Sequence, residues 1–166
     1  MRVFIAGLGL IGGSLALTLK ERGTVEEVMG MEASEERAKE ALSLGLADRI
    51  VPFEEGVTTA DLIVLATPVD TIPMLAVKAL NRVQKPQVVI DLGSTKGELC
   101  EVIDQHTRRS RFVAVHPMWG TEYSGPQAAV KGAFAGRTAV ICERERSDED
   151  ALQMVEELLR TLQMPI

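Results

Sequence analysis

The chain has 166 residues, of which 46% are hydrophobic, 25% are charged and only 4% are aromatic. This length suits one domain whose core consists mainly of Ala, Val, Ile and Leu, which is typical of α/β proteins. The net charge of −6, from 18 basic and 24 acidic residues, argues against general affinity for nucleic acid or anionic membranes.

Six apolar runs predict strands, and capping residues and helix stops between them predict helices. The predicted strands are residues 3–6, 25–31, 62–66, 88–92, 112–115 and 138–142. The predicted helices are residues 14–22, 34–44, 73–80, 96–105 and 148–162. Because the strands are continuous apolar runs, they indicate burial on both faces of a parallel sheet. We therefore expect one doubly wound α/β domain over residues 1–166, with a mostly parallel sheet.

The N-terminal segment and the cysteines bear on cellular location. Arg2 and the apolar run after it imitate a signal peptide, but four glycines interrupt the run and no typical cleavage site follows. No other stretch approaches the roughly 20 uninterrupted apolar residues of a membrane span. Cys100 and Cys142 lie far apart without metal-ligand spacing, so we expect no metal site and a reducing, cytoplasmic compartment.

The motif GLGLIG lies between the first predicted strand and the first predicted helix. Gly7 allows a tight turn, Gly9 lets a pyrophosphate approach the backbone, and Gly12 permits close packing of helix on strand. Leu10 and Ile11 complete the loop, where free N–H groups at a helix N-terminus favour phosphate. The motif predicts a dinucleotide site; the alternative is a structural turn that binds nothing.

Glu32 follows the second predicted strand, about 20 residues after the glycine motif. An acid at this position accepts hydrogen bonds from the hydroxyls of the adenosine ribose. It would repel the 2′-phosphate of NADP, and the next residues, Ala33 and Ser34, supply no arginine. We therefore expect NAD rather than NADP as the cofactor. The alternative is that Glu32 is an ordinary surface acid at a strand end.

Three loops after later strands carry chemically distinctive residues. Thr67 and Pro68 follow LIVLA, Ser94 and Lys96 follow VVIDL, and His116 follows FVAV. Ligands of open α/β sheets bind beyond the carboxyl ends of the strands, so we expect these loops to meet beside the nicotinamide. Thr67, Pro68 and Ser94 would then contact the cofactor.

His116 is the candidate catalytic residue. An imidazole with a pKa near 6.5 can accept the hydroxyl proton when an alcohol carbon loses hydride. Pro117 is expected to stop the strand and fix where His116 projects. The alternative is a strand-end histidine whose ring is satisfied by the backbone. The second histidine, His106, lies in a polar segment and is expected to be solvated.

Four segments, GLGLIGGS, ATPV, DLGSTKG and VHPMWGTEYSG, resemble in order and spacing the prephenate and arogenate dehydrogenases of tyrosine biosynthesis. The first two are shared with many β-hydroxyacid dehydrogenases, whereas HPM-x-G-x-E after D-x-GS-x-KG is more specific. The resemblance implies a Rossmann-type domain and NAD-dependent oxidative decarboxylation. The product would be 4-hydroxyphenylpyruvate from prephenate or tyrosine from arogenate, and the sequence does not decide between them.

The resemblance also implies roles for individual residues. His116 would take the proton of the ring hydroxyl, and Ser94 would contact the same hydroxyl. Glu122 would support the polar network of the site. Lys96 would lie near the cofactor, and the alternative for Lys96 is a local cap or ion pair. The partners implied are small molecules, with no nucleic acid, membrane or metal.

Enzymes of this family continue into an all-helical domain that completes the substrate pocket and forms a homodimer. This chain stops at Ile166, so we expect the second domain to be absent. We expect the chain to bind dinucleotide and to turn over substrate poorly. Two other functions stay open: a dehydrogenase of the same fold that acts on a β-hydroxyacid or an imine, and a non-catalytic dinucleotide-binding module.

Overall fold

Seven strands form one sheet in the order β3-β2-β1-β4-β5-β6-β7. Their bounds are β1 (Arg2–Ala6), β2 (Glu27–Met31), β3 (Arg49–Ile50), β4 (Leu62–Leu65), β5 (Val88–Asp91), β6 (Phe112–Pro117) and β7 (Ala139–Cys142). Every neighbouring pair is parallel except β6 and β7, which are antiparallel. This computed structural model, which describes residues 1–166, confirms the doubly wound, mostly parallel sheet.

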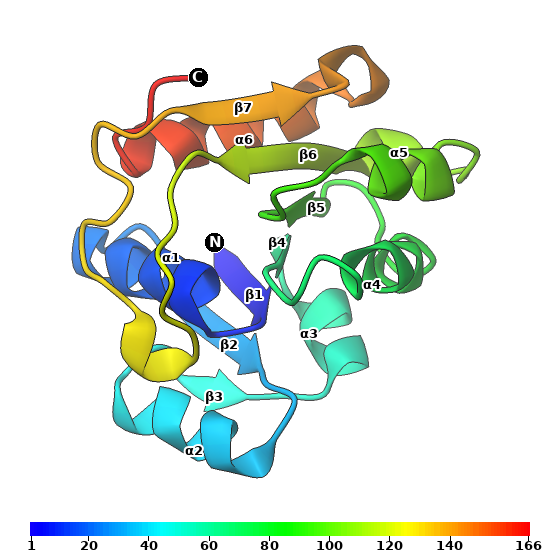
Figure 1. Ribbon diagram of the computed structural model, residues 1–166. Helices are drawn as coiled ribbons and strands as arrows, with labels where there is room; N and C mark the ends of the chain where they lie inside the picture. The colour runs from blue at the N-terminus through cyan, green and yellow to red at the C-terminus, as the bar shows by residue number, and fades with distance from the viewer.

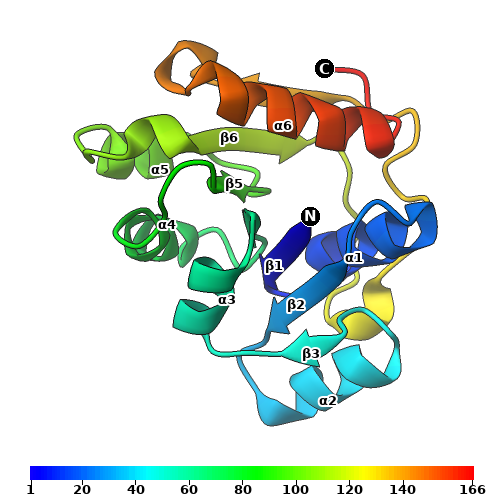
Figure 2. The same cartoon turned by 180° about the vertical axis from the view of Figure 1, so that it is seen from behind.

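Six α-helices cover the two faces of the sheet. Their bounds are α1 (Leu10–Arg22), α2 (Glu35–Ser43), α3 (Phe53–Thr59), α4 (Ile72–Leu80), α5 (Gly97–Ile103) and α6 (Glu149–Thr161). Helices α1, α2 and α6 lie on one face, and α3, α4 and α5 lie on the other (Figures 1 and 2). No helix has both the length and the apolar character that crossing a membrane requires.

The strand alternation divides the core into two halves. In β1, Val3 and Ile5 belong to the apolar cluster under α1 and α6, whereas Phe4 and Ala6 belong to the cluster under α3, α4 and α5. All four side chains are fully buried. Burial on both faces is the reason that the strands are continuous apolar runs.

Several predicted boundaries need correction. The first helix begins at Leu10, not at residue 14, so the second half of the glycine motif is already helical. The short strand β3 and helix α3 were not predicted. A two-residue strand carries almost no sequence signal, but Pro52 followed by two acids in the first turn could have indicated α3.

The end of β6 also differs from the prediction. The apolar run predicts a strand that ends at residue 115, but β6 runs through His116 to Pro117. The antiparallel partner β7 accounts for the extension, because His116 pairs with Val140 and Pro117 with Ala139. The proline does not interrupt the strand, since it is the last residue of β6.

The long connection from β6 to β7 crosses the molecule to α1 and α2. In Figure 1 it leaves β6, passes α1 and reaches the short 3₁₀ turn Pro126–Ala128 before it returns. The buried Ser14 hydroxyl accepts a hydrogen bond from the Val130 N–H (2.8 Å) and so fastens the connection to α1. The connection therefore joins the end of β6 to the region of the glycine motif.

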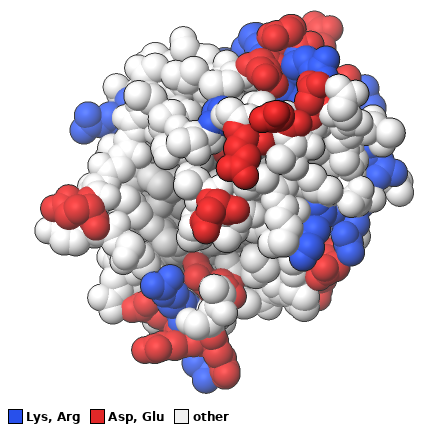
Figure 3. Space-filling view, turned by 45° about the vertical axis from the view of Figure 1, so that its right-hand side comes forward, with Lys and Arg blue, Asp and Glu red and all other residues white.

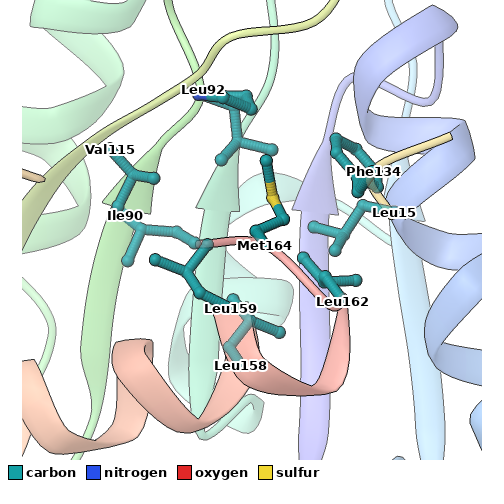
Figure 4. A pocket seen from close by; sticks show the side chains of 10 residues that line it. Leu15, Ile90, Leu92, Val115, Phe134, Leu158, Leu159, Leu162 and Met164 are labelled. Carbon is teal, nitrogen blue, oxygen red and sulfur yellow. The ribbon is translucent and has the colours of Figure 1, made fainter. Parts of the chain in front are cut away.

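The last residues of the chain fill the space under the sheet beside α6. Figure 4 shows the Met164 side chain between Leu92 and Phe134, above Leu159 and Leu162. The enclosed apolar cavity that remains there measures about 10 Å³, which is at most the space of one water molecule. This cavity is a packing gap and not a ligand site.

Candidate active site

The glycine motif forms a tight turn between β1 and α1. Gly7 has φ +93°, and a Cβ at this position would lie 2.6 Å from the Ala66 carbonyl oxygen. A Cβ on Gly12 would lie 1.9 Å from the Gly7 carbonyl oxygen and 3.0 Å from the Ile5 side chain. Both positions therefore require glycine for internal reasons, a turn at Gly7 and close packing of α1 on β1 at Gly12.

Gly9 requires no glycine for internal packing. The atom nearest to a Cβ placed there is the Gly125 nitrogen at 3.8 Å, so the space in front of Gly9 is largely open. The Gly9 N–H has no acceptor in the chain, and the Leu10 and Ile11 N–H groups belong to the first turn of α1, where no partner exists within the helix. This open space with free donors fits a pyrophosphate group.

Glu32 lies against the glycine motif. Its Oε1 accepts a hydrogen bond from the Leu8 N–H, and Oε2 has no partner in the chain. Leu8 itself is fully buried and packs so closely on β2 that a Cβ at Gly30 would lie 2.3 Å from it. The hydrogen bond to Leu8 was not predicted, and it fixes the carboxylate beside the loop with one oxygen available for a ribose hydroxyl.

The end of β4 touches the same turn. The Thr67 nitrogen would be 3.0 Å from a Cβ on Gly7, and the Thr67 hydroxyl accepts a hydrogen bond from the Thr71 hydroxyl (2.8 Å). Pro68 follows on the exposed side. These two residues therefore lie at the sheet edge where the glycine motif turns, and their contact with a cofactor stays a prediction.

The loop after β5 contains a buried ion pair. Lys96 is a predicted site residue; its ammonium contacts Asp91, the last residue of β5, which sequence reasoning did not select. Burial raises the pKa of the Asp91 carboxyl above its ordinary value, and the Lys96 charge opposes that rise. Ser94 lies between them in sequence, is exposed and makes no hydrogen bond within the chain.

The ring of His116 is not satisfied by the protein. Its side chain is half-buried, and neither ring nitrogen makes a hydrogen bond within the chain. By contrast, His106 bonds to the Asn81 side chain and to the Arg108 N–H, both at 3.0 Å. His106 is therefore bonded rather than simply solvated, and His116 is not the satisfied strand-end histidine that sequence spacing left open.

Burial and the nearby Lys96 ammonium lower the pKa of His116 below its ordinary value. Its imidazole is therefore mostly neutral at pH 7 and can accept a proton. It opens into a shallow hollow of about 530 Å³ that it shares with the residues after it and with one residue before β7. The lining is His116, Pro117, Met118, Trp119, Gly120, Thr121 and Arg137.

The remaining predicted residue, Glu122, lies just beyond this hollow. Its side chain is exposed and makes no hydrogen bond within the chain, so its place in a polar network stays a prediction. Arg137 lines the hollow and was missed, because it lies outside the quoted motifs and is an isolated basic residue before β7. A free guanidinium here can attract an anionic ligand.

The whole arrangement suits a reaction of a small molecule beside a bound nucleotide. Phosphate-binding geometry lies at the end of β1, and an unpaired imidazole near a lysine lies at the end of β6. No three His, Cys, Asp or Glu side chains are placed so that they could hold a metal ion. On the face shown in Figure 3, Lys and Arg form no continuous basic patch.

Comparison with known proteins identifies close relatives. The family described as "Prephenate dehydrogenase, nucleotide-binding domain" matches residues 15–165. A prephenate dehydrogenase of Bacillus subtilis is 35% identical over 161 residues, which cover 95% of this chain and 43% of that protein. The chain thus spans about half the length of the curated relatives it matches.

Solved structures agree with the sequence match. The prephenate dehydrogenase of Aquifex aeolicus in complex with hydroxyphenyl propionate and NAD⁺ superposes with a TM-score of 0.90 at 26% identity. The superposition covers 100% of this chain and 58% of the Aquifex chain. The arogenate dehydrogenase of Synechocystis superposes with a TM-score of 0.89 at 28% identity. That superposition covers 100% of this chain and 58% of the Synechocystis chain.

Proposed function

Because the chain belongs to the prephenate dehydrogenase family, in the part that forms its nucleotide-binding domain, we propose that it binds NAD and supplies the catalytic histidine. The reaction would be the oxidative decarboxylation of prephenate or arogenate in tyrosine biosynthesis. The observation that carries this proposal is the unbonded imidazole of His116, at the same edge of the sheet as the open space before Gly9. The Aquifex relative bound to NAD⁺ supports the choice of cofactor.

In the proposed reaction, His116, Ser94 and Lys96 have different roles. NAD, when bound, accepts the hydride that leaves the ring carbon carrying the hydroxyl. His116 accepts the hydroxyl proton as the hydride leaves, and it returns that proton to the same oxygen when carbon dioxide leaves the ring and the ring becomes aromatic. Ser94 holds the same hydroxyl in place, and burial together with the Lys96 charge favours the neutral form of His116 before the reaction. The protein therefore mainly orients the substrate and carries one proton from the hydroxyl oxygen and back to it.

The cofactor would lie along the carboxyl edge of the sheet. Gly9, Leu10 and Ile11 would bind its pyrophosphate, and Glu32 would bind the adenosine ribose through the oxygen that Leu8 leaves free. Thr67 and Pro68 would contact the nicotinamide half. In this arrangement the nicotinamide comes to the end of β5 and β6, where Ser94 and His116 lie.

Other parts of the proposal concern the whole protein. The relatives are about twice as long, and we propose that a further domain supplies the groups that bind the substrate carboxylate and that joins two copies. The two free cysteines support a cytoplasmic location. The direct test is NAD-dependent formation of 4-hydroxyphenylpyruvate or tyrosine by the intact gene product. Turnover of a β-hydroxyacid instead would favour the other dehydrogenase class.

Glu32 is expected to decide the choice between NAD and NADP. Replacing Glu32 with Gln removes the charge that binds the ribose hydroxyls and repels a 2′-phosphate. A hydrogen bond to a charged group contributes about 1.5–3 kcal/mol, so NAD⁺ affinity should fall by about 10-fold or more. The ratio of the affinities for NAD⁺ and NADP⁺ should become smaller at the same time. Calorimetry of both dinucleotides would measure this ratio.

Glu36→Gln is the matched control, because Glu36 is an exposed acid in the first turn of α2 that makes no hydrogen bond. It should leave both affinities unchanged. Equal binding of NAD⁺ and NADP⁺ by the unmodified chain would contradict the assignment of Glu32.

A further inference from the structure

A buried carboxylate that the proposed mechanism does not use lies at the end of β5. Asp91 has no exposed surface, and its Oδ1 makes no hydrogen bond of good geometry, although the Val115 N–H of β6 lies close enough to lower the pKa of the carboxyl. Its Oδ2 accepts from the Gly93 N–H (3.0 Å) and from the Lys96 ammonium. Burying a charged group with an unsatisfied oxygen destabilises a fold, so packing alone does not explain an acid at this position.

Lys96 is held from two sides. Its Nζ donates to Asp91 and to the Gly93 carbonyl oxygen (2.6 Å), and only 11% of the side chain is exposed. The Gly93 peptide groups are therefore bonded to both members of the ion pair. A Cβ on Gly93 would lie 3.1 Å from Asp91 Oδ2 and 3.0 Å from Ile72, so a larger residue would press on the carboxylate. This closed set of contacts fixes the start of the loop that carries Ser94.

The same lysine acts on the catalytic histidine. After burial, the Lys96 ammonium is the second cause of the lowered pKa of His116. Among the residues that line the hollow, Arg137, before β7, is the one with a permanent charge, whereas Lys96 and its partner Asp91 lie at the end of β5 outside the lining. The position of the Lys96 charge therefore affects the protonation of His116.

We propose that Asp91 is a positioning residue of the active site: its buried carboxylate holds the Lys96 ammonium, and the pair fixes both the Ser94 loop and the charge that acts on His116. Asp91 touches neither substrate nor cofactor in this role. It acts through Lys96, which keeps the imidazole in the neutral form that accepts a proton. The effect of Asp91 on catalysis rests on the proposed function. The contacts among Asp91, Gly93 and Lys96 do not depend on that function.

The test is an NMR pH titration of His116 in this chain. The substitution His106→Gln removes the only other histidine signal. Asp91→Asn keeps the shape of the side chain but removes the charge that holds Lys96, so the ammonium should move into solvent. We expect the His116 pKa to rise by roughly 0.5–1.

Lys96→Met is the companion variant, because it keeps an apolar stem without the charge. It should also raise the His116 pKa, and Asp91→Asn added to Lys96→Met should raise it no further, since Asp91 acts through Lys96. The proposal is overturned if Asp91→Asn leaves the titration unchanged or lowers the pKa, or if Lys96→Met does not raise it.

A measurement on the unmodified chain covers the case in which Asp91→Asn does not fold. A lysine ammonium held by two acceptors exchanges slowly with water, so Lys96 should give a resolved ¹⁵N ammonium signal that Lys96→Arg removes. Lys39 is the internal control, because it pairs with Glu35 at 2.8 Å while 74% of its side chain is exposed, and it should give no such signal. Absence of the Lys96 signal would contradict the proposal that Asp91 holds the Lys96 ammonium.

Calorimetry with NAD⁺ on the same samples separates this inference from the proposed function. If NAD⁺ binds and the titration of His116 does not depend on Asp91, the positioning role is wrong and the function stands. If NAD⁺ does not bind and the Asp91 effect is present, the function is wrong. In the intact gene product, Asp91→Asn should lower kcat more than it changes KM and shift the acidic limb of the pH profile to higher pH.

Discussion

Replacing His116 by Asn is expected to lower kcat of the intact gene product by about 10²–10⁴, the usual contribution of a general base. Asparagine can still form hydrogen bonds but cannot accept the hydroxyl proton. The affinity for NAD⁺ should stay within about twofold, because the predicted phosphate and ribose contacts all lie at the ends of β1 and β2. Steady-state kinetics with prephenate and arogenate, with calorimetry for the cofactor, would measure both effects.

His106→Asn is the matched control. His106 is the only other histidine, and its ring is bonded to Asn81 and Arg108 away from the hollow. It should leave kcat unchanged. A His116 variant with nearly full activity would show that another group takes the proton, and Lys96 would be the first candidate.

The pH dependence of the reaction follows from the same residue. The pKa of His116 is lowered by burial and by Lys96, so its neutral form persists below the pH at which a free histidine becomes protonated. Because only the neutral ring accepts a proton, kcat/KM should stay level at neutral pH and fall as the pH drops through this lowered pKa, which a pH profile of steady-state kinetics would show.

The second large effect is expected at Gly12. A Cβ at position 12 would lie 1.9 Å from the Gly7 carbonyl oxygen. Gly7 and Gly12 lie on the two sides of the junction between β1 and α1. The Gly7 carbonyl is backbone and cannot rotate away as a flexible side chain can, so α1 must shift away from β1. We expect Gly12→Ala to lower the free energy of unfolding by at least about 3 kcal/mol and to abolish NAD⁺ binding.

Gly97→Ala provides the comparison for this substitution. Gly97 begins α5, a Cβ there would meet no atom within 4 Å, and its φ is not positive. The exchange should leave the free energy of unfolding unchanged or raise it slightly, because alanine favours helix more than glycine. Urea unfolding of both variants checks the difference, and equal stability of Gly12→Ala and the parent chain would disprove the packing role of Gly12.

The sequence was sufficient for most of the fold because the relevant signals are local. The apolar runs of β1, β4 and β5 and the helix cap at Ser34, whose hydroxyl accepts from the Arg37 N–H at 3.2 Å, can be recognised without tertiary contacts. The local signal for α3 was overlooked, whereas the error at the end of β6 arose because tertiary pairing decides where that strand ends. Strand β6 extends through His116 because β7 pairs with it, and no local pattern encodes that pairing.

The candidate site likewise has some features that local sequence signals indicate and others that depend on tertiary contacts. Residue type and spacing selected the glycine motif, Glu32 and His116 as candidates, but spacing alone left the role of His116 open, and the family resemblance favoured the catalytic one. The bond from Leu8 to Glu32, the buried state of Asp91 and the approach of Arg137 depend on side-chain placement in space. Asp91 was within the quoted motif DLGSTKG, yet an acid at a strand end gives no sign in sequence of whether it is buried.

The most direct measurement is an NMR titration of the ¹⁵N-labelled chain with NAD⁺, carried out in the His106→Gln background so that His116 is the only histidine. The account predicts that the Gly9 amide and the His116 ring respond together and saturate at the same NAD⁺ concentration. If Gly9 reaches saturation while the His116 ring does not respond, the imidazole is not beside the bound nicotinamide. The assignment of His116 as the proton acceptor would then be wrong.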